Sequence, residues 1–248
     1  MYNMRETRHI MGMPVIIEIV GGTYEALAAV FDYFSAVDAR FSTYKPESEI
    51  MKVNRGELKE SEQSDEMRQI FALAEQTKKE TAGYFSIRSP DGSTDPSGLV
   101  KGWAIRNAAR LVEELGYANY FIDVGGDIQS RGTNGNGKTW TVGIRNPFNR
   151  AEIVKVLSPR GRGIATSGTY IRGQHIYNPH EPAHRIDDIV SLTVIGPDIY
   201  GSDRFATAAF AMGKDGIVFL EQLPEFEGYL IDSAGIATMT SGFEKFIA

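Results

Sequence analysis

The amino-acid sequence predicts an α+β fold in which helices flank a mixed or antiparallel sheet. Hydrophobic residues make up 42% of the 248 residues and charged residues 23%, which supplies enough apolar material for a folded core. The helical and β patterns follow one another in mixed order, which favours α+β over a parallel doubly wound sheet. No repeat, low-complexity tract or linker divides the chain, so we expect a single domain over residues 1–248.

The first half of the chain is predicted to form one strand followed by four helices. Residues 11–22 read as a buried strand that a glycine pair stops. Thr23 is a typical N-cap, and Gly116 is a typical residue after a helix end. Between them, apolar residues recur at helical spacing. The helices are expected over residues 23–41, within 42–54, and over 62–80 and 99–115.

The second half is predicted to be mostly β. Six runs rich in apolar and β-branched residues read as strands, separated by turns that contain glycine. These strands are expected over residues 120–128, 139–147, 152–158, 163–168, 169–179 and 188–197. A helix is then expected from Gly201 to Gly213 and a short one over 215–223. The sheet is expected to close with strands at 227–235 and 236–246.

Composition and charge exclude several classes of function. The formal net charge is -6, so no global basic field holds a nucleic acid or an anionic membrane, and neither is expected as a partner. The absence of cysteine excludes disulfides, thiolate metal sites and a cysteine nucleophile. No apolar run approaches the roughly 18 residues of a membrane span. The N-terminus carries charges where a signal peptide needs apolar residues, so we expect a cytoplasmic protein without membrane insertion.

The stretch "DPSGLVKGWA", residues 95–104, combines an acid, a bare backbone position and a lysine at a predicted helix start. A site for a phosphate or a metal could use all three, with Gly98 leaving a main-chain carbonyl unobstructed. A helix N-terminus disfavours a cation, so Lys101 is expected to have an anionic partner. The alternative is a helix that Asp95 caps, with a solvated lysine.

A second candidate lies in "GSDRFATAAFAMG", where Asp203 and Thr207 are four residues apart. On a helix they project from one face. A carboxylate and a hydroxyl are hard oxygen ligands of the kind that Mg²⁺ prefers. The alternative is that Asp203 is an N-terminal charge on the helix and that Thr207 bonds back to a carbonyl.

A third candidate is "GIATSGTYIRGQHIYNP", residues 163–179. Thr166, Ser167 and Gly168 read as a small, donor-rich turn that suits a ligand phosphate. His175 follows on a predicted strand, where a lone histidine is more often a structural residue than a base. The segment "DVGGDI", residues 123–128, places a glycine pair between two acids, which a tight hairpin explains equally well.

Taken together and in this order, the segments resemble the ApbE family of FAD:protein FMN transferases. The resemblance extends over nearly the whole chain, and its most specific parts are the glycine–lysine–glycine segment and the Asp-x-x-x-Thr-Ala helix. The matching segments are "MGMPV", "FSTYKPESEIMKVN", "TAGYFSI", "DPSGLVKGWA", "DVGGDI", "WTVGIRNP", "ATSGTY", "HIYNP", "VSLTVIGP" and "SDRFATAAFAMG".

The resemblance implies a Mg²⁺-dependent enzyme that cleaves FAD, passes FMN to a threonine or serine hydroxyl of a partner flavoprotein and releases AMP. The implied metal ligands are Asp203, Thr207 and the main-chain carbonyl of Gly98. Lys101 would assist as charge builds on the phosphate oxygens, and Asp203 would act through the metal. His175 is the implied base that takes the acceptor's proton.

The resemblance also implies which residues contact FAD. Asp95 and Lys101 fall where the family contacts FAD, and His175 and Tyr177 match its histidine strand. The donor-rich segment would approach a phosphate through Thr166, Ser167 and Gly168. The residues implied to line the flavin or adenine pocket are Met11, Tyr44, Tyr84, Phe85 and Ser86, with Tyr44 suited to stacking.

The chain departs from the family in ways that leave alternatives open. It has neither the export signal nor the cysteine of many members, which implies a cytoplasmic acceptor. It reads Asn178-Pro179-His180-Glu181-Pro182 where the family often has Asp-Pro-x-Thr-Gly, which affects the local loop. The alternatives to transfer are a Mg²⁺-dependent FAD pyrophosphatase that yields FMN and AMP, and a non-catalytic flavin carrier.

Overall fold

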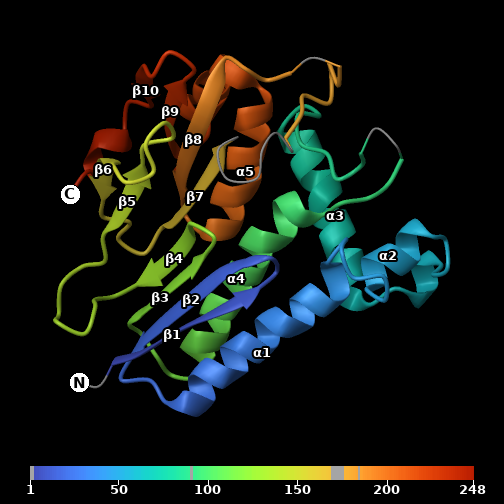
Figure 1. Ribbon diagram of the computed structural model, residues 1–248, viewed down its shortest axis with the longest axis horizontal. Helices are drawn as coiled ribbons and strands as arrows, with labels where there is room; N and C mark the ends of the chain where they lie inside the picture. Colours follow the sequence, from blue (N-terminus) through green and yellow to red (C-terminus); the bar gives the residue numbers. More distant parts are fainter. Residues whose placement is uncertain (1–2, 90–91, 169–175, 184) are drawn as a thin grey trace.

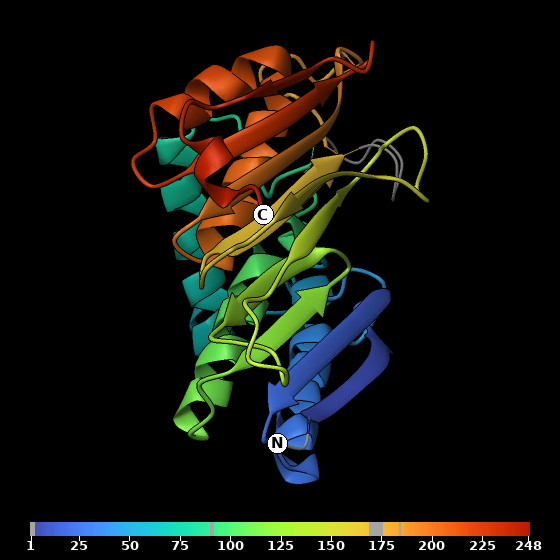
Figure 2. The ribbon, with the colours of Figure 1, turned by 90° about the vertical axis from the view of Figure 1, so that its left-hand side faces the viewer.

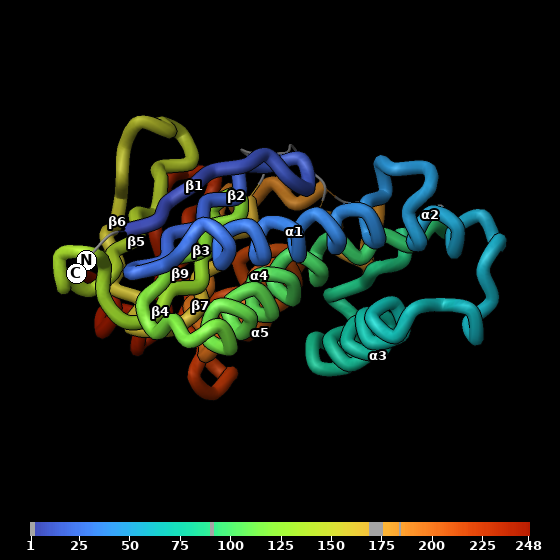
Figure 3. Tube along the Cα trace, turned by 90° about the horizontal axis from the view of Figure 1, so that it is seen from below, coloured from blue at the N-terminus to red at the C-terminus, as the bar shows by residue number. Residues whose placement is uncertain are grey.

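The computed structural model describes residues 3–89, 92–168, 176–183 and 185–248. Figure 1 shows the strands gathered on one side of the molecule and the long helices on the other. The first described residues, in β1, and the C-terminus lie on the side of the strands, as Figure 3 also shows, whereas α2 and α3 lie at the opposite end. The α+β class expected from the mixed order of elements is confirmed.

The main sheet has eight strands, and each neighbouring pair is antiparallel. Figure 2 shows its two ends, with the blue strands β1 and β2 at one end and the red C-terminal strands at the other. In order across the sheet, the strands are β1 Asn3–Ile10, β2 Met13–Val20, β3 Tyr120–Val124, β4 Asp127–Arg131, β7 Gly163–Gly168, β8 Ile189–Gly196, β9 Glu227–Asp232 and β10 Ala237–Met239. A separate antiparallel pair consists of β5 Val142–Arg145 and β6 Ile153–Leu157.

Four of the α-helices begin at a polar residue whose side chain caps them. Thr23 accepts a hydrogen bond from the Ala26 N–H at 3.2 Å, which confirms the predicted cap. The α-helices are α1 Tyr24–Phe41, α2 Glu49–Asn54, α3 Asp65–Glu80, α4 Ser97–Glu114, α5 Ile199–Ala211 and α6 Gly216–Glu221. Short 3₁₀ turns are η1 Glu60–Glu62, η2 Gly213–Asp215 and η3 Phe243–Phe246. Among the described residues, no helix is long and apolar enough to span a membrane.

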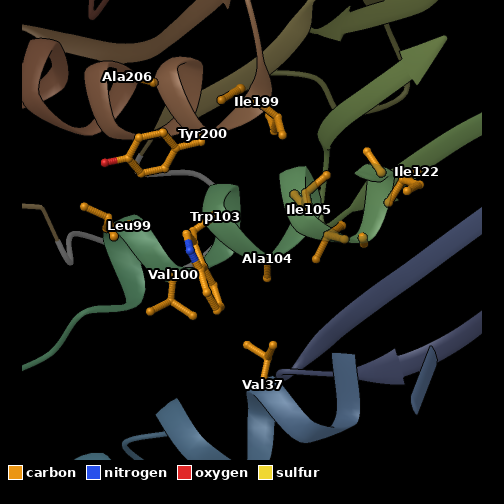
Figure 4. Packing of buried hydrophobic residues seen from close by; sticks show 14 of the residues in the cluster. Val37, Leu99, Val100, Trp103, Ala104, Ile105, Ile122, Ile199, Tyr200 and Ala206 are labelled. Atoms are coloured by element: carbon orange, nitrogen blue, oxygen red, sulfur yellow. The ribbon is translucent and has the colours of Figure 1, made fainter. Parts of the chain in front are cut away.

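Alternation along the strands gives the sheet two buried faces. One face packs against α1, α4 and α5, and α4 lies at the centre of this layer. Figure 4 shows Trp103 and Ala104 of α4 beside Val37 of α1 and Tyr200 of α5. The other face packs against β5, β6 and η3, through a second cluster that contains Ile128, Ile164 and Phe243. The sheet is therefore the middle layer of three.

Four predictions about strands need correction. The segment 120–128 is not one strand but contains β3, a turn at Gly125 and Gly126, which both have positive φ, and the start of β4. β1 was not predicted, because this edge strand consists mostly of polar and charged residues and has no fully buried side chain. Residues 176–179 are not part of a strand, and the Tyr177 hydroxyl instead donates to the Arg88 carbonyl at 2.6 Å; residues 169–175 lie outside the described residues. In the segment 236–246, only Ala237–Met239 is a strand, and Gly242 precedes a 3₁₀ turn.

Candidate functional site

A cavity of about 840 Å³ lies at the edge of the sheet where β2 begins, β3 turns into β4 and β7 ends. It extends from the helix layer to the β5–β6 pair, and its volume is in the usual range for small-molecule sites. The predicted site residues that line it are Tyr84, Phe85, Ser86, Asp95, Gly98, Lys101, Thr166, Ser167, Gly168, Tyr177, Asp203 and Thr207. Residues far apart in the sequence are thus brought together.

The helices α4 and α5 cross closely beside this cavity, and Gly102 allows the approach. A Cβ added at Gly102 would lie 2.6 Å from the Asp203 Cβ and 2.9 Å from the Ile199 carbonyl oxygen. The Gly102 N–H donates to Asp203 Oδ2 at 2.7 Å. Asp203 lies one turn into α5 and is 3% exposed, and Asp198 is the residue that caps the helix. Asp203 is therefore a buried side chain aimed at α4, which contradicts the alternative of a helix-start charge.

Lys101 lies between two buried carboxylates, which confirms that it has an anionic partner. Its Nζ is 2.5 Å from Asp127 Oδ2 and 3.4 Å from Asp203 Oδ1. Burial raises the pKa of Asp203 to about 7; the Lys101 ammonium and the Gly102 N–H oppose this rise, and the nearby Asp127 adds to it. When both carboxyls are ionised, they exceed the one ammonium by a negative charge, and in that state this part of the cavity attracts a further cation.

Asp127 has a second contact that fixes its orientation. Its Oδ1 accepts a hydrogen bond from the Thr166 N–H at 3.1 Å, and Thr166 Oγ1 lies 2.9 Å from Thr193 Oγ1. Thr166, Ser167 and Gly168 form the end of β7 rather than the turn that the sequence predicted. The end of the strand and the start of the β3–β4 hairpin are thereby tied together at the cavity.

Gly98 and Thr207 lie next to each other across the same helix crossing. A Cβ at Gly98 would be 3.5 Å from Thr207 Cγ2 and 3.8 Å from Thr207 Oγ1, which is ordinary contact. Within the described residues, the Thr207 hydroxyl forms no hydrogen bond, in contrast to Thr77, which bonds back to the Leu73 carbonyl at 2.8 Å. The alternative in which Thr207 bonds back along its helix is therefore wrong.

One wall of the cavity consists of two segments that dock on each other. Asp95 accepts from the Ser97 N–H at 3.0 Å at the start of α4, and its own N–H donates to the Ile87 carbonyl at 2.7 Å. His180 Nε2 lies 3.0 Å from the Ala82 carbonyl oxygen, and its ring meets the Tyr84 ring edge-on at 4.6 Å. Tyr84 to Ile87 and Ile176 to Pro179 therefore form a continuous wall.

Three predicted site residues are not placed at the cavity. Tyr44 is 95% exposed in the loop before α2, and it does not line the cavity. Met11 lies in the turn between β1 and β2, where its neighbours Gly12 and Met13 line the cavity but Met11 itself does not. His175 lies outside the described residues. The contacts of Met11 and Tyr44 with FAD stay predictions that this cavity does not support.

Sequence reasoning missed Asp127, Gly102 and the outer wall formed by β5 and β6. Asp127 directly follows the glycine pair of the β3–β4 hairpin, where Gly125 and Gly126 both have positive φ. The segment "DVGGDI" was noted for its two acids and among the segments that match the family, but a tight hairpin explained it equally well, and no role was given to Asp127. Gly102 lies three residues after a hydrophobic position in a helix, and a glycine inside a helix was the available signal of close packing.

The protein oxygens at the cavity suit a divalent cation but do not fill its coordination shell by themselves. Asp203 and Thr207 supply a carboxylate and a hydroxyl, and Gly98 supplies a main-chain oxygen nearby. In the part of the chain that the structure describes, no three acidic or histidine side chains gather as a metal site. A cation here would need substrate oxygens or water to complete its shell.

Comparison with known proteins gives one matching family. The model described as "ApbE family" matches residues 11–91 and 87–230. Among curated proteins, the FAD:protein FMN transferase of Escherichia coli (strain K12) is 31% identical over 176 residues, which cover 66% of this chain and 50% of that protein. The same-named protein of Haemophilus influenzae is 30% identical over 186 residues, covering 68% and 52%. The chain thus spans about half the length of these relatives.

Solved structures share the fold over the whole chain. The ApbE protein of Thermotoga maritima has a TM-score of 0.87 at 18% identity, covering 100% of both chains. The flavin transferase ApbE of Vibrio cholerae has a TM-score of 0.86 at 20% identity, covering 99% of both chains. At these identities the likeness supports the architecture and not the chemistry.

Proposed function

Because this chain belongs to the ApbE family, we propose that it is a Mg²⁺-dependent FAD:protein FMN transferase. A threonine or serine hydroxyl of an acceptor flavoprotein attacks the FMN phosphorus of FAD, and AMP departs with the electrons of the broken P–O bond. The observation that carries the proposal is the cluster of Lys101, Asp127 and Asp203 beside Thr207 at a cavity of about 840 Å³. The names of the curated relatives support the same reaction.

Asp203, Thr207 and the main-chain oxygen of Gly98 would hold Mg²⁺. All three are hard oxygen donors, and the excess of buried negative charge beside Lys101 favours a cation. The Gly102 N–H, which stands one helical turn after Gly98, donates to Asp203 and so orients the carboxylate. Bound there, Mg²⁺ would offset the negative charge that builds on the phosphate oxygens.

The chain's own residues would position the substrate and move a proton. Lys101, held by Asp127, supplies a positive charge toward the same oxygens. The wall from Tyr84 to Ile87 and from Ile176 to Pro179 would orient the flavin nucleotide and exclude water. His175, which directly precedes the cavity residue Ile176 in the sequence, is our candidate for the base that takes the hydroxyl proton.

The test is transfer to an acceptor flavoprotein followed by intact-mass spectrometry and chromatography of nucleotides. With FAD and Mg²⁺, we expect the acceptor to gain the mass of one FMN while AMP appears in equal amount. Asp203→Ala should abolish both products with a nearly unchanged far-UV circular dichroism spectrum, because it removes a proposed ligand and little core volume. Rapid FMN release without an acceptor would make the protein a pyrophosphatase, and recovery of unchanged FAD would make it a carrier.

The role of His175 is tested separately. His175→Ala should slow transfer more than it weakens FAD binding, because a base acts on the reacting proton and not on the ground state. Unchanged turnover with a large loss of FAD affinity would instead make His175 a binding residue.

A further inference from the structure

Lys101 is shared unequally between its two acids. Its Nζ is 2.5 Å from Asp127 Oδ2 but 3.4 Å from Asp203 Oδ1. Direct charge-assisted contacts are usually about 2.7–2.9 Å, so the first is a full contact and the second is not. The ammonium group therefore stands nearer to Asp127, although both carboxylates are almost completely buried.

The unequal sharing has a cause in the backbone contacts of the two acids. Asp127 is 2% exposed, and its Oδ1 accepts from the Thr166 N–H, which turns Oδ2 toward Lys101. Asp203 uses Oδ2 to accept from the Gly102 N–H at 2.7 Å. Its Oδ1 lies 3.4 Å from the Lys101 ammonium, and the Asp203 carboxyl also lies beside the Asp127 carboxyl. The longer distance to Lys101 allows another positive partner at Oδ1.

We infer that Asp127 is a positioning residue whose charge holds Lys101 away from Asp203 and keeps Asp203 Oδ1 available to a divalent cation. This inference rests on the proposed function, in which Asp203 is a metal ligand. Without the Asp127 charge, Asp203 would be the nearest acid to Lys101 among the residues that the structure describes, and the ammonium would compete with the cation for Oδ1. Asp127 thus prevents a cation of the chain itself from occupying the metal site.

The test is a double-substitution cycle with binding of Mn²⁺ or Mg²⁺ alone as the readout. Asp127→Asn keeps an oxygen for the Thr166 N–H and removes only the charge. We expect it to weaken cation binding about tenfold, as measured by Mn²⁺ electron paramagnetic resonance and Mg²⁺ calorimetry. Lys101→Met should strengthen binding only two- to threefold in the wild type, but about tenfold in the Asp127→Asn background, because there it removes a direct competitor.

A matched control separates this effect from the loss of one negative charge. Asp123 lines the same cavity at the other side of the β3–β4 turn and accepts from the Gly126 N–H at 2.8 Å. Asp123→Asn should lower cation affinity by a smaller factor, and Lys101→Met should add the same two- to threefold gain in that background. Apo melting curves of all variants check the fold.

The outcomes distinguish the positioning role of Asp127 from the proposed metal site itself. Equal gains from Lys101→Met in the wild-type and Asp127→Asn backgrounds would overturn the positioning role while leaving the metal site standing. A wild-type protein that binds neither cation would overturn both the inference and the proposed metal requirement. If Asp127→Asn does not fold, Asp127→Glu serves as the second variant. It retains the negative charge, so its cation affinity should lie within about threefold of the wild type, and a larger difference would contradict the inference.

Discussion

Two glycines in α4 should respond in opposite ways to the same substitution. In Gly102→Ala, the new Cβ would lie 2.6 Å from the Asp203 Cβ and 2.9 Å from the Ile199 carbonyl oxygen. Carbon atoms prefer a separation of about 3.5–4.0 Å, so the neighbours must move by roughly 1 Å. In Gly98→Ala, the new Cβ would meet nothing closer than 3.5 Å.

The free energy of unfolding should separate the two variants. Overpacking of this kind costs about 1–3 kcal/mol, and the better helix propensity of alanine returns up to about 1 kcal/mol. Gly102→Ala should therefore lose up to about 2 kcal/mol. Gly98→Ala should gain about 0.5–1 kcal/mol, because it has the same propensity benefit without a steric conflict. Urea denaturation followed by circular dichroism measures both values.

The rate of FMN transfer should differ more between Gly102→Ala and Gly98→Ala than the free energy of unfolding does. Moving Asp203 by roughly 1 Å should cost on the order of 100-fold in FMN transfer, since catalytic groups tolerate little displacement. Gly98→Ala should transfer FMN within about threefold of the wild type, because the proposed ligand at residue 98 is a main-chain oxygen. A Gly102→Ala protein with wild-type stability and turnover would mean that α4 and α5 do not cross as described.

Further outcomes test the electrostatics and the walls of the cavity. Burial raises the pKa of Asp203 to about 7, so protons compete with a cation for this carboxylate at lower pH. Mg²⁺ should therefore raise the melting temperature more at pH 8 than at pH 6. Equal increases at the two pH values in scanning fluorimetry would contradict this. His180 does not line the cavity but ties its wall to the Ala82 carbonyl, so His180→Ala should weaken FAD binding about fivefold, the equivalent of one hydrogen bond of about 1 kcal/mol. His9→Ala, on the exposed face of β1, should leave FAD affinity unchanged. Fluorescence quenching measures both affinities, and equal values would mean that this hydrogen bond does not support the wall. Tyr44→Ala should leave the calorimetric FAD affinity within about twofold, because the side chain is 95% exposed, and a large loss would return Tyr44 to the site.

Local patterns in the sequence were sufficient to predict the helices and to predict that Asp203 and Thr207 lie on one face of a helix. A cap such as Thr23 and an i,i+4 pair depend only on residues a few positions apart. β1 was not predicted because an edge strand needs no fully buried face, and its mostly polar sequence shows no apolar alternation. Short elements such as β10 depend on the strand beside them, and the sequence alone does not specify that partner.

The electrostatic centre of the site could not be predicted by the same means. Lys101 comes from α4, Asp127 from β4 and Asp203 from α5, and no spacing in the sequence relates the three. Local patterns indicated Lys101 at a helix start and Asp203 in an i,i+4 pair, but as separate candidates, and the resemblance implied a role for each. Only the packing of three elements reveals that one ammonium serves two acids, and that Asp127 belongs with them.

The β5–β6 pair has a consequence for how the cavity can change. Residues 132–162, which contain it, form an excursion between β4 and β7, and these two strands pair directly with each other. Its side chains nevertheless form the outer wall of the cavity, through Val142, Ile144 and Ile153. An exchange of this hairpin would leave every pairing of the central sheet intact. Because Val142, Ile144 and Leu157 of the hairpin also belong to the buried cluster on this face of the sheet, any change in the hairpin alters the cavity wall and that layer of the core together, but not the strand order.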